Sequence, residues 1–303
     1  MSRLHDNRLR SLAEAARGGT MRAASENLNV APSSISRQIA QLEEELGLPL
    51  IERNRSPLKL TEAGELALSY YREFTIQQET FISQVRDLNQ LKGGTVKLAV
   101  GEAMIGDLLS NVLDRFMGQY PDIRVVVRTG GTAEVVGLVQ EDEAHMGLVF
   151  QPEPNAKIRV RASSDQPIKV IANPTHPISK RDKVNLQDLV NERIALPESA
   201  FRISQVLNDV EAQEHLFFQP VMVSNSLMVL KEFVRSGQGI TLLPGIAAHT
   251  EVADGRLNAI LIDHPSLLHT SASVITRLGR QLPVAAVRLL QKIEATMPFF
   301  PAS

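Results

Sequence analysis

Cysteine is absent from the 303 residues of the chain. Its absence excludes a disulfide framework, a thiol nucleophile and every zinc site that depends on thiolate ligands. Long apolar runs are also missing, since none approaches the roughly 20 residues of a membrane-spanning helix. The start of the chain, MSRLHDNRLR, is charged along its length and is not followed by the apolar segment of a signal peptide. We therefore expect a cytoplasmic, bacterial-type protein without a membrane partner.

The chain has no large excess of charge, glycine or proline: the net charge is -2, with 18 glycines and 16 prolines. Together with 43% apolar residues, these counts exclude a disordered or collagen-like chain. At about 150 residues per domain, the length predicts two domains, each large enough to bury a core. A nearly neutral chain can bind nucleic acid only through a local basic surface.

Motifs of catalysis are missing as well. The chain contains no Gly-x-Ser-x-Gly elbow, no glycine-rich phosphate loop with Lys-Ser/Thr and no His-Glu-x-x-His. The seven histidines are scattered, and the spacing of His264 and His269 does not make a metal pair on one helix face. We therefore expect no enzyme, no cofactor and no bound metal.

Residues 1–61 predict short helices joined by tight turns and followed by a basic loop. Gly18 and Gly19 end the first helix, whose apolar face contains Leu9, Leu12, Ala13 and Ala16. Thr20 can cap a second helix that ends near Leu28. Pro32 suits the first position of a third helix, where no amide donor is needed.

The third helix has two distinct faces. At about 100° per residue, one stripe is apolar and contains Ile35, Ile39, Leu42 and Leu46. The opposite face contains Ser33, Ser34, Arg37 and Gln41. Such a face fits the major groove of DNA, because arginine pairs with guanine edges while serine and glutamine reach bases or phosphates. Ala23 and Ala24 in the preceding helix permit the close crossing of a helix-turn-helix.

A basic segment, residues 52–59, follows this helix. Arg53, Arg55 and Lys59 have the reach that contact with phosphates or the minor groove requires. Each feature alone is also compatible with an ordinary surface helix or a solvated loop. Their order and spacing together favour DNA binding.

Residues 62–91 contain no proline and can form one long helix. Apolar residues recur every seven positions along it, at Ala67, Phe74, Phe81 and Leu88. Part of this face can pack on the same chain, but it exposes more apolar surface than a small domain can cover. We therefore predict that residues 62–92 form a dimerisation helix.

After residue 94 the pattern alternates between strands and helices, which predicts an α/β fold with parallel sheets. The expected strands are 95–100, 123–128, 146–150, 168–172, 194–196, 220–223, 240–243, 259–262 and 273–276. Helices are expected at about 104–119, 132–141 and 281–296.

Ligands of open α/β sheets bind beyond the carboxyl ends of the strands. Four such junctions supply the candidate ligand-binding residues, which are Glu102, Ala103, Met104, Thr129, Gly130, Gly131, Thr132, Ser199, Phe201, Arg202, Asn225 and Ser226. Helix capping, plain turns and solvated loops are the alternatives at these positions. Arg202 could bind a carboxylate or pair with Glu198, and Glu102 would repel an anion unless Glu102 itself is paired, so the charge of the ligand stays open.

Residues 9–66 closely resemble the winged helix-turn-helix of LysR-type transcriptional regulators. The matching stretch is RAASENLNVAPSSISRQIAQLEEELGLPLIERNRSPLKLTEAGE, in which the Leu-Glu-(Glu)2-Leu-Gly and Leu-Thr-Glu-Ala-Gly segments are specific to that family. A weaker match continues through Tyr120-Pro121, residues 239–244 and Gly255-Arg256-Leu257. By this motif Ser33, Ser34, Ser36, Arg37, Arg53 and Arg55 occupy positions that face DNA or lie beside it.

The resemblance implies a DNA-binding domain at 1–61, a linker helix at 62–92 and an effector-binding domain at 93–303. That last domain is expected to be two-lobed and Rossmann-like, with lobe 1 at about 93–167 and 269–303 and lobe 2 at about 168–268. The implied partners are double-stranded DNA, a small-molecule effector in the interlobe cleft and a second copy of the chain in a dimer or tetramer. RNA polymerase is a further candidate partner.

The chain departs from the family pattern at a few positions. Ala31 and Pro32 replace a frequent polar cap and glutamine, which removes one DNA contact, and Ile51 replaces the phenylalanine that opens the wing. His145 stands where an aspartate is usual, and we expect it on a loop or lobe surface. The alternative function is that of a non-catalytic solute-binding α/β protein whose helical module serves another interaction.

Overall fold

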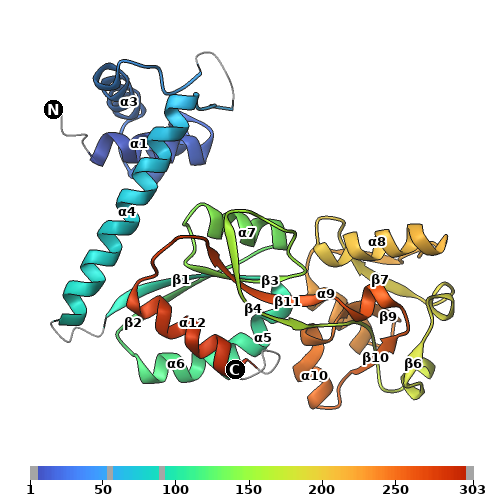
Figure 1. The fold of residues 1–303 in the computed structure, drawn as a ribbon. Helices are drawn as coiled ribbons and strands as arrows, with labels where there is room; N and C mark the ends of the chain where they lie inside the picture. The colour runs from blue at the N-terminus through green and yellow to red at the C-terminus, as the bar shows by residue number, and fades with distance from the viewer. Residues whose placement is uncertain (1–5, 53–56, 89–92, 298–303) are drawn as a thin grey trace. The chain divides into compact units, whose positions relative to one another are not determined.

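A computed structural model describes residues 6–52, 57–88 and 93–297 of the chain (Figure 1). The chain divides into two compact units, Met1–Ile82 and Ser83–Ser303. The boundary between them falls within the long helix α4 (Glu62–Leu88).

The amino-terminal unit contains three short helices before α4, which are α1 (Asp6–Gly18), α2 (Met21–Leu28) and α3 (Pro32–Leu46). The Thr20 hydroxyl accepts a hydrogen bond of 3.1 Å from the Ala23 amide, which confirms the predicted cap of α2. Asn29 ends α2 in the left-handed conformation, and Pro32 occupies the start of α3. The turn between the two helices therefore follows directly from local sequence.

The apolar faces of these helices meet in one core, to which Leu12, Ile35, Ile39, Leu42 and Leu50 contribute fully buried side chains. Two details differ from the expected pattern. In α1 the buried alanine is Ala15, whereas Ala13 and Ala16 are only half-buried. Leu46 is exposed, because it lies in the last turn of α3, at the edge of the core.

The second unit contains two separate sheets. The first has the strand order β2-β1-β3-β11-β4 and the second has the order β6-β10-β5-β9-β7-β8. The strands of the first sheet are β1 (Gly94–Val100), β2 (Ile123–Thr129), β3 (Met146–Phe150), β4 (Ile158–Asp165) and β11 (Ser271–Arg277). Those of the second sheet are β5 (Ile168–Ala172), β6 (Lys183–Val184), β7 (Ile194–Pro197), β8 (Met222–Ser224), β9 (Ile240–Pro244) and β10 (Asn258–Ile262).

Both sheets are mixed rather than wholly parallel. In the first sheet β1 pairs in parallel with β2 and β3, whereas β11 pairs antiparallel with β3 and β4. In the second sheet β5 lies antiparallel to both β9 and β10. The strands beside the two passages between the lobes, β4, β5, β10 and β11, take part in these antiparallel pairings, and β10 also pairs in parallel with β6.

Helices cover both faces of the first sheet (Figure 1). One face packs on η2, α6 and α12, whose residues share a buried core with β1 and β3. The other face packs on α7. The helical segments of this lobe are η1 (Glu102–Met104), α5 (Ile105–Asp107), η2 (Leu108–Leu113), α6 (Asp114–Gln119), α7 (Thr132–Gln140) and α12 (Val284–Thr296).

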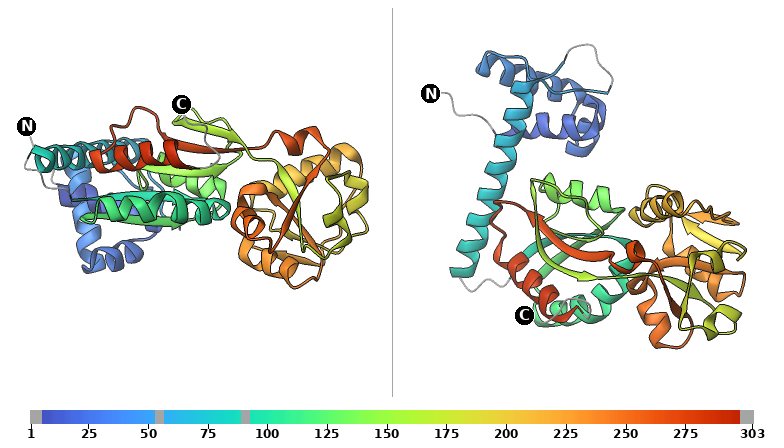
Figure 2. Two further views of the ribbon diagram at one scale, coloured as in Figure 1. Left: turned by 90° about the horizontal axis from the view of Figure 1, so that it is seen from below. Right: turned by 45° about the vertical axis from the view of Figure 1, so that its right-hand side comes forward.

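The second sheet has its own core, and the two views of Figure 2 show it as a lobe beside the first. Its helical segments are η3 (Pro177–Lys180), η4 (Leu186–Leu189), α8 (Arg202–Glu214), α9 (Leu227–Arg235), η5 (Gly245–Ala248), α10 (His249–Ala253) and α11 (Pro265–Leu268). The chain passes between the lobes twice, once between β4 and β5 and once after β10 toward β11.

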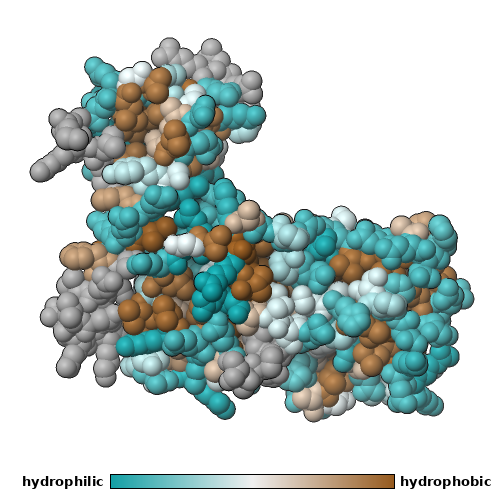
Figure 3. All heavy atoms as spheres, in the orientation of Figure 1, coloured by the Kyte–Doolittle hydropathy of each residue, from teal (hydrophilic) through white to brown (hydrophobic). Residues whose placement is uncertain are grey.

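The face in Figure 3 shows hydrophobic residues in separate patches among hydrophilic ones. No helix within the described ranges is long and apolar enough to cross a membrane.

Candidate functional site

The outward face of α3 is polar and open to solvent. Ser33, Ser36, Arg37 and Gln41 are exposed, and Ser34 is half-buried. Arg37 forms no ion pair with any residue that the structure describes. A guanidinium without an internal partner is free to bind the edge of a base or a phosphate.

Contacts with α1 hold α3 in place from the inner side. The buried Ser11 hydroxyl donates a 2.5 Å hydrogen bond to Oε1 of Gln38, and Arg8 forms an ion pair with Glu45. Ile35 and Ile39 are buried on the same side of the helix. The polar face is therefore turned outward by packing and by side-chain contacts.

A short antiparallel pairing follows α3, in which Ile51 bridges Leu60 and the Glu52 amide donates to the Lys59 carbonyl at 2.9 Å. Lys59 is exposed and has no described ion-pair partner. Arg53 and Arg55, the other basic residues predicted for this hairpin, lie outside the described residues. The structure therefore describes the two paired strands of the hairpin, at residues 51–52 and 59–60.

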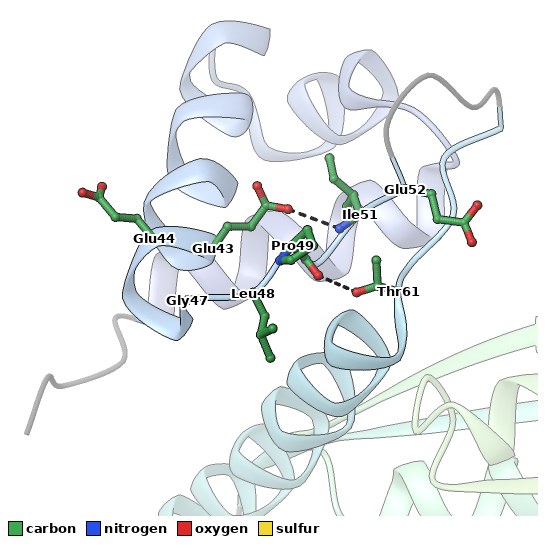
Figure 4. Close-up of a pocket in the computed structure, with 8 residues that line it drawn as sticks. All are labelled: Glu43, Glu44, Gly47, Leu48, Pro49, Ile51, Glu52 and Thr61. Atoms are coloured by element: carbon green, nitrogen blue, oxygen red, sulfur yellow. Dashed lines mark hydrogen bonds between the residues drawn. The ribbon is translucent and has the colours of Figure 1, made fainter.

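Glu43 fixes the first strand of this hairpin, a role that the sequence pattern did not predict. One of its carboxylate oxygens accepts a hydrogen bond of 2.7 Å from the Leu50 amide and one of 3.3 Å from the Ile51 amide, and Figure 4 shows the second of these. The Thr61 hydroxyl donates to the Pro49 carbonyl at 2.6 Å on the other side. An open pocket of about 740 Å³ lies beside these bonds. In the sequence, the only indication that Glu43 has a structural role was its position in the Leu-Glu-(Glu)2-Leu-Gly segment that is specific to the family.

Gly64 explains part of the Leu-Thr-Glu-Ala-Gly segment. A Cβ atom at this position would lie 2.1 Å from the Leu50 carbonyl oxygen, so only glycine lets the start of α4 approach the strand so closely. The Thr61 hydroxyl accepts from the Gly64 amide at 3.1 Å and so caps the same turn.

The apolar row of α4 is partly exposed. Phe74 is 38% exposed and Phe81 is 63% exposed, and Tyr70 stacks on Phe74 at 6.5 Å between ring centroids. Ala67 was predicted to lie on the dimerisation face of the helix. It is instead buried in the core of its own unit. The side chain of Leu88 lies outside the described residues.

In the second unit, Glu102 joins the two lobes. It begins η1 in the first lobe, and its Oε1 accepts hydrogen bonds from the Ser226 hydroxyl at 3.1 Å and the Met228 amide at 3.2 Å, both in the second lobe. Ala103 follows and packs against the cores of both lobes. Two of the four predicted junctions therefore meet at Glu102.

Met104 is not a surface residue. Its side chain is 0% exposed and lies in the core of the first lobe, so the prediction that it contacts an effector is wrong. The short turn of η1 directs Met104 inward two residues after Glu102.

The second junction, at residues 129–132, approaches the third. The Thr132 hydroxyl donates to the Phe150 carbonyl at 2.8 Å, and the Gly130 amide donates to the Val100 carbonyl at 3.2 Å. A Cβ atom on Gly131 would lie 3.8 Å from the Ala200 carbonyl oxygen of the second lobe. Thr129 is exposed at the end of β2.

Arg202 contacts the first lobe. Its guanidinium donates to the Gln151 carbonyl at 3.2 Å and pairs with Glu153 at 3.1 Å. Neither the expected pairing with Glu198 nor a free carboxylate clamp is present among the described contacts. Gln151 and Glu153 follow the buried strand β3, and proline on either side of Glu153 was the only available signal for this loop.

The remaining predicted residues differ in exposure. Ser199 and Asn225 are exposed, whereas Phe201 packs on the core of the second lobe as the residue before α8. Ser226 precedes α9 but does not cap it with its own side chain, since its hydroxyl donates to Glu102.

Two histidines differ from what the sequence indicated. His145 is buried rather than on a surface, and its Nδ1 accepts from the Lys97 amide at 3.1 Å beside β1. His249 contacts the buried Asp107 at 2.9 Å, which adds a further contact between the lobes. A cavity of about 350 Å³ lies next to this pair and is also lined by Gln166 and Lys169. Within the described ranges no three histidine, aspartate or glutamate residues are placed to hold a metal ion.

The architecture defines a class of protein in which a winged helix-turn-helix is joined through a long helix to a two-lobed α/β domain. A model described as a bacterial regulatory helix-turn-helix protein of the lysR family matches residues 7–65, and a model described as the LysR substrate binding domain matches residues 89–298. The chain belongs to the LysR family: it is a DNA-binding transcriptional regulator with an effector-binding domain.

Individual relatives agree with this assignment. The HTH-type transcriptional activator CmpR of Synechocystis sp. is 27% identical over 283 residues, which cover 92% of this chain and 91% of that protein. Full-length CbnR complexed with its target DNA matches with a TM-score of 0.57 and 19% identity over 96% of this chain and 99% of that one. The CcmR regulatory domain of Synechocystis in complex with 2-PG matches with a TM-score of 0.61 and 21% identity, covering 69% of this chain and 100% of that one. The two structures support the fold.

Proposed function

We propose that α3 enters the major groove of DNA and that Ser33, Ser34, Ser36, Arg37 and Gln41 contact bases or phosphates there. The exposed, unpaired guanidinium of Arg37 on an otherwise small polar face carries this proposal. Lys59, Arg53 and Arg55 bind the flanking phosphates or the minor groove. The CbnR complex with target DNA, which has the same fold, supports this use of the module.

The proposed active form is an oligomer built on α4. Phe74 and Phe81 expose apolar rings at a spacing of one heptad, and a helix from a second copy would cover them. Two copies also supply two helix-turn-helix heads for two half-sites about one turn of DNA apart. Whether two or four chains assemble does not change this contact.

The proposed effector is a small molecule bound between the lobes, where Glu102, Ala103, residues 129–132, Ser199, Phe201, Arg202, Asn225 and Ser226 lie at the four junctions. Binding there would shift the population between lobe arrangements and so alter the spacing of the DNA heads. The 2-PG complex of the CcmR regulatory domain supports a ligand in this type of domain. We further propose that the protein is cytoplasmic, needs no cofactor, catalyses no reaction and regulates transcription through RNA polymerase.

DNA binding is tested with a fragment from the region upstream of the chain's own gene. Fluorescence anisotropy of the full chain should show log affinity falling linearly with log salt, by about 0.9 for each phosphate contacted. Arg37→Ala should cost about 1–3 kcal/mol of binding free energy and relax the sequence preference. Arg115→Ala, which removes an exposed arginine of α6, is the matched control and should bind normally. Binding that is absent or insensitive to salt would favour the solute-binding alternative.

A further inference from the structure

The cavity of about 350 Å³ beside His249 has a lining of its own. Its walls come from α5 of the first lobe, from the passage between β4 and β5, and from β5, β10, η5 and α10 of the second lobe. None of its described lining residues belongs to the four strand junctions of the proposed effector cleft. We propose that this cavity is a second ligand site and that it binds a small zwitterion, an amino acid with an aliphatic side chain.

Lys169 supplies the positive charge of the cavity. It is half-buried and forms no ion pair with the residues that the structure describes. Its side chain passes over Gly245, where a Cβ atom would lie 3.5 Å from the lysine Nζ. A partly buried ammonium that lacks an internal acceptor has lost some of its water without gaining a partner, so an anionic group in the cavity stabilises it. Lys169 therefore suits the carboxylate of the ligand.

Two carboxylates line the same cavity. Asp107 is 5% exposed, and its Oδ1 contacts Nδ1 of His249 at 2.9 Å and accepts a hydrogen bond of 3.3 Å from the Asn111 side chain. Asp165 is exposed at the end of β4, and its side chain has no described partner. A ligand that carries only a negative charge would meet these two carboxylates, and one that carries only a positive charge would meet Lys169. A molecule with charges of both signs is complementary to the whole lining.

His249 adds an acceptor for the positive end of the ligand. Because an ionised carboxylate only accepts hydrogen bonds, Nδ1 of His249 carries the proton that is donated to Asp107. Nε2 of the neutral ring is then an acceptor, and it makes no hydrogen bond with the residues that the structure describes. It can accept a hydrogen bond from an ammonium group, as the carboxylate of Asp165 can.

The size of the cavity and its apolar walls suit a small organic molecule. Pro167, Ile246, Val252 and Ala259 supply apolar lining around the charged groups. Cavities that bind small ligands have volumes of about 300–1,000 Å³, with a few polar groups on mainly apolar walls. With about 350 Å³, this cavity lies near the lower end of that range. An aliphatic amino acid matches both its size and its lining.

The cavity also lies where the two lobes are joined. Residues 165–167 form one of the two passages between the lobes, and the contact of Asp107 with His249 joins α5 of the first lobe to α10 of the second. A ligand that binds Asp165, Lys169 and His249 would therefore act on the contact between the lobes without entering the effector cleft.

The test uses three probes that share one branched aliphatic group. L-Leucine carries both charges, 4-methylpentanoate lacks the ammonium, and 3-methylbutan-1-amine lacks the carboxylate. Each is titrated into the full chain by calorimetry at pH 7 and constant ionic strength. L-Leucine should bind about tenfold or more tightly than either of the other two, because one hydrogen bond to a charged group contributes about that factor.

Two variants locate the binding site. Lys169→Met keeps the length of the side chain but removes its ammonium, and it should weaken L-leucine about tenfold while leaving 3-methylbutan-1-amine unchanged. Asp165→Asn should weaken L-leucine and leave 4-methylpentanoate no weaker. Lys180→Met removes an exposed lysine of η3 outside the cavity, and as the matched control it should bind L-leucine normally.

Three outcomes would overturn the second site. These are no binding of L-leucine, equal or tighter binding of a probe with one charge, and unchanged L-leucine affinity in either Lys169→Met or Asp165→Asn. If Lys169→Met does not fold, the exposed position of Asp165 carries the test alone. Salt-dependent DNA binding of the wild-type chain is measured on the same preparation. The proposed function and the second site can therefore fail independently of each other.

Discussion

Glu43 links the recognition helix to the hairpin through two backbone amides. A carboxylate that accepts two amide hydrogen bonds replaces the missing partners of an irregular strand, so its loss leaves Leu50 and Ile51 without acceptors. Sequence reasoning placed α3 and the hairpin correctly but assigned no role to this side chain. The reason is that the bonds join α3 to residues seven and eight positions later, across a turn that sequence periodicity does not describe.

Glu43→Ala should lower the free energy of unfolding of the amino-terminal unit by about 1.5–3 kcal/mol, because two hydrogen bonds to a charged acceptor are lost. DNA affinity should fall as well, since the hairpin is held less firmly. Urea unfolding and anisotropy measure the two effects. Glu44→Ala removes an exposed neighbour and serves as the control. Equal stability of both variants would contradict the role of Glu43.

Asp188 in η4 has a pKa below its ordinary value, first because the Asn185 amide donates to its carboxylate and then because Arg181 hydrogen-bonds to it. A lowered pKa in the folded state adds stability above the unfolded pKa of 3.8, and that stability is lost as the pH falls below it. Asp188→Asn should therefore lower the Tm at pH 7 and lower it less at pH 3. Calorimetry at both pH values measures this, and the same loss at each would argue against it.

Met104 and Arg202 show where prediction of single residues reached its limit. Both were placed at strand junctions by sequence order, and both do follow strands. Burial of Met104 depends on the direction of a single 3₁₀ turn, and the partner of Arg202 lies on another lobe, some fifty residues away in the chain. The spacing of nearby residues in the sequence predicts neither the burial of Met104 nor the ion pair of Arg202. The polar face of α3 was predictable because a regular helix fixes its own exposure.

At the scale of elements, the regular helices and most buried strands followed from periodicity and from glycine and proline positions. The segment 104–119, expected as one helix, is instead a 3₁₀ turn, a short helix, the π-helical η2 and α6. The edge strand β4 was missed, because its apolar alternation is short and ends in the polar residues 163–165, and most of the strand is exposed. Strand direction was also wrong in part, since composition does not distinguish a parallel from an antiparallel neighbour.

The exposed rings of Phe74 and Phe81 on α4 allow the proposed contact between two copies of this helix to be tested. Phe81→Asp should convert the oligomer to a smaller species and weaken operator binding at the same time, because a charge replaces an apolar contact between helices. Light scattering coupled to size-exclusion chromatography measures the mass. Gln78→Asp, an exposed polar position of the same helix, should leave the mass unchanged. A Phe81→Asp monomer that binds the operator normally would refute the assignment.

For the molecule as a whole, length and strand pattern predicted a helical module and an α/β part, and the family resemblance implied that this part has two lobes. The two sheets and their cores agree with that architecture. The contacts between the lobes were not predictable. Glu102 to α9, Arg202 to the loop after β3, and Asp107 to His249 each join residues more than forty positions apart. Ala103 and Ile246 each also pack against the core of the opposite lobe, so polar and apolar contacts hold the lobes together.

The missing side chain at Gly64 has a mechanical consequence. With only hydrogen between the first turn of α4 and the Leu50 carbonyl, the helix and the hairpin strand touch backbone to backbone. No flexible side chain of residue 64 separates the two backbones at this point. We expect a rotation of the first turn of α4 to be passed directly to the hairpin strand at Leu50.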